Sequence, residues 1–261
     1  MQKNTVIRHP GNPVLTAADV PYDATLVFNA GVCKWHGVYY MVFRNDYGPR
    51  TPEDYRAGIP IQTNLGLAKS PDGVNWEVAP RPVFSLGGAA STDTDIRRAY
   101  DPRLTVLDDR IYMCFAVDTN HGIRGGLAVT DDFAEFEILS MSAPDNRNMV
   151  IFPERIDGKI ARLERPFPIY GRGAPEAFDT WYADSPDGRY WGNQQLVLGS
   201  ESVPFANNKI GPGAPPVRTE RGWLTVIHAV YKDDNRDLGG WGANPWTKRY
   251  VAGLVLLDLD E

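Results

Sequence analysis

Several features that define other classes of protein are scarce or missing in this chain of 261 residues. Its two cysteines, Cys33 and Cys114, lie in strand-like runs, so we expect buried thiols and neither a disulfide framework nor a thiolate metal site. The longest apolar stretch, residues 251–257, is interrupted by Gly253 and is too short to cross a bilayer. The N-terminal residues contain no apolar segment of the secretory type, which predicts a cytoplasmic protein.

An excess of positive charge is also absent, because 27 Lys and Arg stand against 33 Asp and Glu. This balance argues against a nucleic-acid partner. The four histidines do not pair at metal-ligand spacing, and the chain has neither a His-Glu-x-x-His motif nor a Gly-x-Ser-x-Gly elbow. We interpret the Gly-rich pieces at 122–126 and 239–242 as turns, since they lack the strand and helix around a nucleotide loop. We therefore expect no metal and no organic cofactor.

Helical periodicity is equally scarce, whereas turn formers and aromatic residues are common, with 25 Gly, 21 Pro, 7 Trp and 12 Tyr. Apolar runs of strand length recur between turn signals. They lie at 38–44, 65–69, 110–117, 126–130, 180–183, 223–231 and 250–258. The pattern predicts an all-β fold.

A repeated hairpin organises these runs. In each copy a strand ends in Ser or Thr, a turn carrying Asp-Gly or Asp-Asp follows, and an aromatic residue opens the next strand; the copies are 65–77, 126–137 and 179–191. The anchors Ser70, Thr130 and Ser185 lie 60 and 55 residues apart. Earlier strand pairs, turning at residues 36–37 and 108–109, complete units of four strands, which is typical of propeller blades and not of a sandwich.

We predict four blades, near 15–80, 81–140, 141–200 and 201–261, packed radially around a central funnel. The funnel is where we expect a functional site. The last apolar run stops where a further Asp-rich turn is expected. We therefore expect one propeller domain over 1–261 that is short at its C-terminus.

The segment Arg-Ala-Tyr-Asp-Pro-Arg-Leu (98–104) offers one acid among several cations. Asp101 precedes Pro102, where the chain is held extended or turning. It is either a simple turn residue or a proton donor, with Tyr100 as a surface for a sugar ring. A proton donor needs a raised pKa, so we expect burial against its neighbours and an Arg103 side chain that points elsewhere.

Basic residues also flank a second hairpin, in which the Asp157-Gly158 turn separates two apolar runs. Its charges either lie harmlessly at the surface, or the two strands bring Arg147 and Arg165 to one end of the sheet. Two guanidinium groups placed together match a tetrahedral oxyanion. Lys209 precedes a Gly-Pro-rich link, and His228 in the next apolar strand is either a core residue or lines a channel.

Polar residues that could recognise a sugar end the run 38–44. Arg44, Asn45 and Asp46 either form an ordinary polar turn or bind sugar hydroxyls at the funnel mouth. The Trp-rich stretch 239–246 either caps acceptor subsites or packs between blades.

Six segments together resemble the β-mannoside phosphorylases of glycoside hydrolase family 130. They are Phe-Asn-Ala-Gly-Val (28–32), Ser-Pro-Asp-Gly-Val-Asn-Trp (70–76), Tyr-Asp-Pro-Arg-Leu (100–104), Arg-Asn-Met-Val-Ile-Phe-Pro-Glu (147–154), Ala-Arg-Leu-Glu-Arg-Pro (161–166) and Lys-Ile-Gly-Pro-Gly (209–213). The resemblance runs from about residue 12 to the end of the chain. It implies a five-bladed β-propeller, of which this chain holds about four blades, and phosphorolysis of β-mannosides to α-mannose 1-phosphate.

The resemblance also implies roles for individual residues. Asp101 matches the general acid, whose proton is thought to pass through the sugar 3-hydroxyl group. Arg147, Arg165 and Lys209 match phosphate-binding residues, and His228 matches a histidine of the same site.

One acid facing several cations suits phosphorolysis, because phosphate is already an anion and needs no second carboxylate as a base. We expect inverting attack on β-1,4-mannosides, with a mannooligosaccharide, a mannosyl-hexose or N-acetylglucosamine as the acceptor side and phosphate as co-substrate. A β-mannoside hydrolase on the same scaffold is one alternative, and a non-catalytic carbohydrate-binding propeller is another. A homo-oligomer could form if an incomplete ring exposes the face of a blade.

Overall fold

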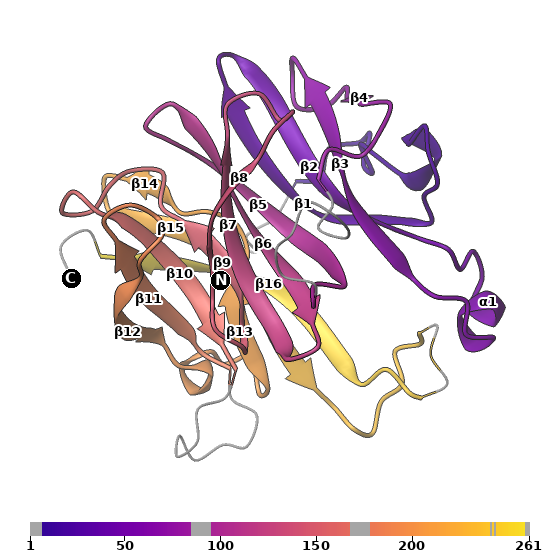
Figure 1. Ribbon diagram of the computed structural model, residues 1–261. Coiled ribbons are helices and arrows are strands. Elements are labelled where there is room, and N and C mark those ends of the chain that lie inside the picture. Colours follow the sequence, from indigo (N-terminus) through magenta and orange to yellow (C-terminus); the bar gives the residue numbers. More distant parts are fainter. Residues whose placement is uncertain (1–6, 85–94, 168–177, 241, 243, 259–261) are drawn as a thin grey trace.

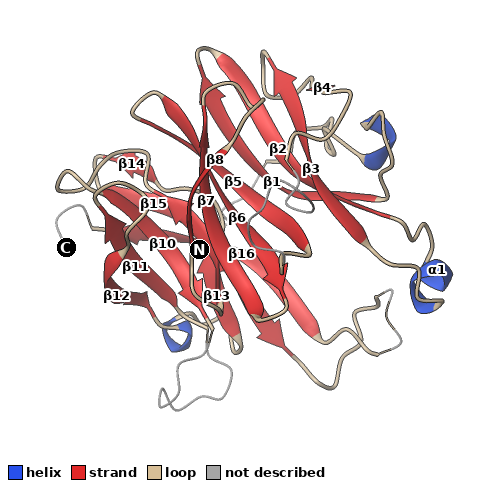
Figure 2. Cartoon of the chain, in the orientation of Figure 1, coloured by secondary structure: helices blue, strands red, loops and turns tan. Residues whose placement is uncertain are grey.

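The computed structural model describes residues 7–84, 95–167, 178–240, 242 and 244–258. These residues form an arrangement of strands with very little helix (Figures 1 and 2), which confirms the all-β prediction. The helical pieces are the 3₁₀ turns η1 (Ala17–Asp19) and η2 (Ser200–Ser202) and the helix α1 (Pro52–Arg56). In the described part of the chain, no helix has the length and apolar character needed to cross a membrane.

The described strands form four sheets that follow one another along the chain. The first contains β1 (Leu26–Trp35), β2 (Val38–Tyr47), β3 (Gln62–Ser70) and β4 (Glu77–Val78). The second contains β5 (Arg98–Leu107), β6 (Arg110–Thr119), β7 (Gly122–Thr130) and β8 (Glu137–Met141). The third contains β9 (Asn146–Ile151), β10 (Ile160–Pro166), β11 (Thr180–Ser185) and β12 (Gly192–Leu198), and the fourth β13 (Lys209–Pro212), β14 (Val217–Thr219), β15 (Gly222–Lys232) and β16 (Lys248–Leu257).

The sheets are the blades of a propeller. In the first three, each strand pairs antiparallel with the next, so the blade begins on an inner strand and ends on an outer one. In the fourth, β13 and β14 pair in turn with one edge of β15, and β16 pairs with its other edge. The first strands of successive blades, β1, β5, β9 and β13, lie side by side around the centre. The four predicted blades are therefore confirmed.

The repeated sequence motif is a hydrogen-bonded turn between the third and fourth strands of a blade. In the first blade the Ser70 hydroxyl accepts from the Gly73 backbone N–H at 2.8 Å, and Asp72 accepts from that of Asn75 at 2.8 Å. Trp76 then donates its indole N–H to the Gly73 carbonyl at 3.1 Å. The turns at Thr130 and Ser185 repeat the side-chain to backbone bonds, so the motif is a local unit that the sequence specifies by itself.

Apolar side chains fill the spaces between neighbouring blades. Val42 and Leu65 of the first blade pack with Leu104 and Met113 of the second. The second and third blades share another cluster, and the third and fourth share one around Trp223. Burial on both sheet faces explains why the middle strands read as continuous apolar runs. Of the two predicted buried thiols, Cys114 is buried, whereas Cys33 is only partly buried.

Candidate active site

A cavity of about 910 Å³ opens where the inner strands meet. It brings together seven residues that the sequence motifs singled out, from all four blades: Arg44, Tyr100, Asp101, Arg147, Arg165, Lys209 and His228. Segments that lie more than a hundred residues apart in the chain thus contribute to one site. Asp101 and the basic residues Arg147, Arg165 and Lys209, which were predicted from separate motifs, therefore line the same cavity.

The inner strands β1, β5 and β9 each carry a one-residue bulge at the cavity. The extra residue is seen in the strand pairing. The register shifts between Phe28 and Gly31 on β1 and between Tyr100 and Arg103 on β5. On β9 it shifts opposite the residues between Leu163 and Arg165 of β10. At each bulge one residue has a left-handed backbone: Asn29 (φ 49°), Asp101 (φ 54°) and Asn148 (φ 59°). Asn and Asp tolerate this conformation best among non-glycine residues, and bulges redirect side chains. The three side chains are thereby presented to the cavity.

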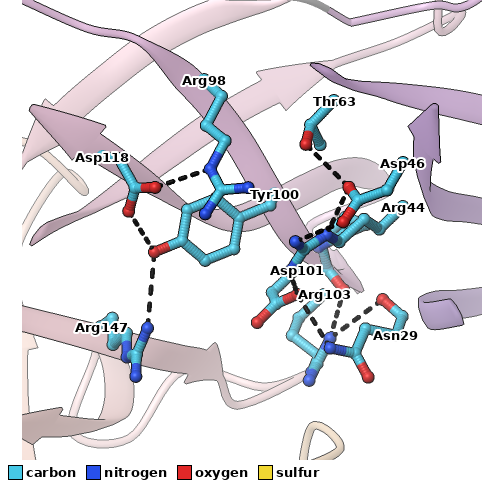
Figure 3. A network of polar contacts seen from close by, with 11 residues as sticks. Asn29, Arg44, Asp46, Thr63, Arg98, Tyr100, Asp101, Arg103, Asp118 and Arg147 are labelled. Atoms are coloured by element: carbon cyan, nitrogen blue, oxygen red, sulfur yellow. Dashed lines mark hydrogen bonds and ion pairs between the residues drawn. The ribbon is translucent and has the colours of Figure 1, made fainter. Parts of the chain in front are cut away.

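Asp101 is held at the cavity by two donors (Figure 3). Asn29 Nδ2 donates to Asp101 Oδ1 at 2.9 Å, and Arg44 Nη1 lies 3.3 Å from the same oxygen. Both contacts fall on Oδ1, so the two donors leave Oδ2 without a hydrogen bond from the described residues. The side chain is 21% exposed and remains accessible to a ligand.

The guanidinium beside Asp101 is Arg44, and Arg103 points elsewhere. Arg103 Nε donates to the Gly213 carbonyl at 2.5 Å, and its Nη1 donates to the Pro102 carbonyl at 2.7 Å. The expectation that Arg103 would not bond to Asp101 is thus met. Asp46 holds the Arg44 side chain through two hydrogen bonds. Arg44 Nε donates to Asp46 Oδ1 at 2.9 Å, and Arg44 Nη2 donates to Asp46 Oδ2 at 2.7 Å. Burial opposes the Arg44 charge, but Asp46 and Asp101 outweigh it and raise the Arg44 pKa.

Three basic side chains from the third and fourth blades also line the cavity. Arg147 of β9 and Arg165 of β10 are direct cross-strand partners, so the hairpin does bring both to one end of the sheet. The Arg165 side chain is buried, and the Nε atoms of both arginines lack a hydrogen-bond partner among the described residues. Burial, and then the neighbouring Arg147 charge, lower the pKa of Arg165 to about 9. Lys209 is also buried, with Nζ 5.8 Å from the centre of the Phe178 ring and 5.5 Å from that of Tyr250.

The buried Arg165 and the half-buried Arg147 carry like charges on neighbouring strands, so they repel each other, and the Nε atom of each lacks a hydrogen-bond partner among the described residues. An anion between them would accept from the unpartnered N–H groups and offset the repulsion. The geometry is therefore that of a site for an oxyanion such as phosphate.

His228 contacts this basic group as a neutral ring. Burial first, then the charges of Arg165, Arg103 and Lys209, lower its pKa to about 3. Arg165 Nη1 lies 2.9 Å from His228 Nε2, and because arginine only donates, Nε2 must be the accepting nitrogen. The proton then sits on Nδ1, which fits a hydrogen bond to the backbone of Pro212, a residue without an N–H group. In this arrangement His228 orients Arg165, whereas the sequence-based prediction assigned it directly to phosphate.

Two further predictions on sugar recognition need correction. Tyr100 is only 3% exposed, with the Arg44 and Arg98 guanidinium groups 4.9 and 5.1 Å from its ring centre, so its face is not open to a sugar. Asn45 does not line the cavity. Its side chain is fully buried and donates to the Asp23 carbonyl at 2.8 Å, because alternation on β2 turns it away from Arg44. Asp46 does not line this cavity, but it holds Arg44 and lines a second, adjoining cavity.

Four polar side chains that line the cavity were not among the residues predicted from the sequence: Asn29, Asp118, Asn148 and Tyr250. A usable signal existed for the two asparagines, since each interrupts a strand-like run with a residue that tolerates a left-handed backbone. Tyr250 and Asp118 lie within ordinary strands and gave no such signal.

A second cavity of about 730 Å³ adjoins the first and shares Arg44 and Trp246 with it. Tyr47 and Tyr55 add aromatic surface to its lining. Of the Trp-rich stretch 239–246, Trp246 therefore borders both cavities, while residues 241 and 243 lie outside the described part of the chain.

The fold and the cavity define a β-propeller whose central cavity is lined by basic side chains and by the carboxylates Asp101 and Asp118. Comparison with known proteins makes this specific. A family model described as β-1,4-mannooligosaccharide phosphorylase matches residues 9–261, and the chain belongs to this family, glycoside hydrolase family 130. The resemblance seen in the sequence is thus confirmed.

The chain is similar to the β-1,4-mannooligosaccharide phosphorylase of Ruminococcus albus, with 28% identity over 98% of this chain and 75% of the relative. It is 32% identical to the β-1,2-mannobiose phosphorylase of Listeria innocua, over 98% of this chain and 79% of that protein. A solved structure of Listeria innocua β-1,2-mannobiose phosphorylase in complex with β-1,2-mannobiose has a TM-score of 0.74 and 25% identity, and covers 97% of this chain and 79% of that one. These relatives are phosphorylases, which supports an enzymatic function for this chain.

Proposed function

We propose that this protein is an inverting β-mannoside phosphorylase that releases α-mannose 1-phosphate. The observation that carries the proposal is a single cavity lined by Asp101 from the second blade and by Arg147, Arg165 and Lys209 from the third and fourth blades. Phosphate is the co-substrate, and no metal or organic cofactor is required.

In the proposed reaction the basic group holds phosphate by its outer oxygens. One phosphate oxygen forms a bond to the anomeric carbon of the mannosyl unit from the α face while the β-glycosidic C–O bond breaks. Asp101 supplies the proton that ends on the leaving oxygen, which becomes a hydroxyl group of the released sugar. Positive charge must stay away from the anomeric carbon because the transition state is oxocarbenium-like.

We further propose that the linkage is β-1,4 and that the released sugar is a mannooligosaccharide, a hexose or N-acetylglucosamine. The family model supports the β-1,4 linkage, while relatives named for β-1,4 and β-1,2 substrates are both similar to this chain. The adjoining cavity lined by Tyr47, Tyr55 and Trp246 offers aromatic surface for the leaving sugar.

The test incubates the protein with β-1,4- and β-1,2-linked mannobiose, with and without phosphate, and follows products by ¹H and ³¹P NMR. We expect α-mannose 1-phosphate only when phosphate is present. Asp101→Asn should lower the rate about 10²- to 10⁴-fold, because the amide has no acidic proton. Asn is the sharpest substitution because it tolerates the left-handed backbone and can still accept from Arg44 and Asn29.

Asp109→Asn is the matched control. Asp109 is an exposed, left-handed residue on the turn between β5 and β6, so the same chemical change there should leave the rate unaltered. Phosphate-independent release of mannose would instead indicate a hydrolase. Binding of mannobiose without turnover would indicate a non-catalytic propeller.

A further inference from the structure

Asp118 is a carboxylate of the cavity that the proposed reaction does not use. It lies on β6 directly opposite Arg98 of β5, and it lines the same cavity as Asp101. A second carboxylate near an acid is what a hydrolase would need to activate water. The contacts of Asp118 therefore indicate whether it could act as a base for water or instead holds another residue in position.

Both oxygens of Asp118 already accept hydrogen bonds (Figure 3). Arg98 Nε donates to Oδ2 at 2.6 Å, and the Tyr100 hydroxyl donates to Oδ1 at 2.7 Å. The contact with Arg98 is also an ion pair, so the carboxylate accepts both bonds. Asp118 is thus committed to its two protein partners.

The bond to Asp118 fixes the direction of the Tyr100 hydroxyl group. Since the Tyr100 proton points to Asp118, the lone pairs of its oxygen face the other way. Arg147 Nη1 lies 3.4 Å from that oxygen. Burial, followed by the contact with Asp118, raises the pKa of Tyr100 to about 12, so the hydroxyl keeps its proton and its role as a relay.

Arg147 has little else to hold it. Within the described residues the Tyr100 oxygen is its hydrogen-bond acceptor, and its Nε atom has none. The Phe167 ring lies 5.6 Å from its guanidinium carbon, and Arg165 stands opposite with the same charge. A guanidinium under this repulsion needs a fixed acceptor to keep its place at the site.

We propose that Asp118 is a positioning residue for phosphate binding, which acts through the Tyr100 hydroxyl to hold Arg147 at the cavity, and that it is not a general base for water. This inference rests on the proposed function for its kinetic consequences. The hydrogen-bond chain itself, from Asp118 through Tyr100 to Arg147, joins strands β6, β5 and β9.

The test compares Asp118→Asn and Tyr100→Phe with the wild-type protein. We expect each to raise KM for phosphate about five- to tenfold, as for the loss of one hydrogen bond, while KM for the mannoside and kcat at saturating phosphate change by less than about twofold. The double variant should lose no more than the worse single variant, because both substitutions break the same chain. Asp118→Glu keeps an ionised acceptor and should recover part of the phosphate affinity.

Asp131→Asn is the matched control, since Asp131 also accepts from an arginine of β6, Arg110 at 2.7 Å, but does not line the cavity. Calorimetry with inorganic phosphate separates this inference from the proposed function. Weaker phosphate binding by Asp118→Asn supports positioning even if no phosphorolysis is found. An unchanged phosphate affinity, additive losses in the double variant, or a water-dependent cleavage abolished by Asp118→Asn would each overturn the proposal.

Discussion

Two buried arginines on strand β10 differ in the charged residue that lies beside each of them, and this difference affects stability. Arg162 lies 2.6 Å from the Glu164 carboxylate, and that pair is buried at the interface of two blades. Arg165 faces the cavity, is 1% exposed, and has the Arg147 cation as its cross-strand neighbour. The first charge is compensated within the protein, whereas the second lies beside another cation at the cavity. In the phosphate site that we propose, affinity for the anion comes at the expense of stability in its absence.

We predict opposite effects on stability for the same substitution at these positions. Arg165→Met should raise the melting temperature without phosphate by about 2–4 °C, equivalent to about 1 kcal/mol, because it removes an uncompensated buried charge. Arg162→Met should destabilise the fold by about 3–5 kcal/mol, because it leaves Glu164 buried without its partner. Thermal unfolding at low ionic strength measures both.

In the presence of phosphate, we expect the wild type to become more stable than Arg165→Met. At 100 times its Kd, phosphate stabilises a protein by about 2.7 kcal/mol, and we expect this for the wild type but not for Arg165→Met. If Arg165→Met lowers the melting temperature, or if phosphate protects it as well as the wild type, the anion site has been misassigned.

The bulged inner strand is the element that positions the acid. Asp101 occupies the bulge of β5. At Gly31, β1 lies so close to this bulge that a side chain at that position would have no room. A Cβ atom on Gly31 would lie 2.8 Å from Arg103 Cα, 2.8 Å from Leu104 N and 2.9 Å from Pro102 O. These are backbone atoms, which cannot rotate away. Contact between the two strands therefore fixes both the spacing of the first two blades and the direction of Asp101.

We expect Gly31→Ala to destabilise the protein by about 1–3 kcal/mol, since overpacking forces the two backbones apart. The rate should also fall in the folded fraction, because the β5 bulge carries Asp101. Urea unfolding and the mannose 1-phosphate assay measure the two effects. Gly192→Ala on β12 is the control, because a Cβ atom at that position would have no neighbour within 4 Å among the described residues. Both properties of this variant should stay near wild type.

In the whole molecule, the fourth blade carries a strand with large exposed apolar side chains, β16. Among the described strands β16 pairs with β15 alone, and Leu254 and Leu256 on it are 71% and 45% exposed. Large exposed apolar side chains on an unpaired edge strand favour association with another sheet. A second copy of the chain presents the same strand and could pair with it about a two-fold axis.

We therefore predict reversible dimers at micromolar concentration, seen by sedimentation velocity. Leu254→Lys should shift the protein to monomers by placing charge on the exposed face, whereas Lys232→Ala on the neighbouring strand should leave association unchanged. A wild-type protein that stays monomeric over the whole concentration range would contradict this prediction.

The sequence determined by itself those features that depend on short-range hydrogen bonds and on strand alternation. The Ser/Thr-Asp turns, the tight turn at Asp108-Asp109 and the hairpin that pairs Arg147 with Arg165 all form between residues close in the chain. Alternation also places Asn45 on the face opposite Arg44, although the prediction from the sequence grouped the two residues at one site.

The tertiary structure decided how these local units meet. Packing between strands or blades brings Arg44 to Asp101 and places two guanidinium groups over the Tyr100 ring. It also lets the Tyr100 hydroxyl link Asp118 to Arg147. Such contacts follow from the fit of apolar surfaces far apart in the chain, which no local pattern encodes. Most of the polar residues that line the cavity could therefore be predicted from the sequence, while the contacts of each residue depended on its neighbours in space.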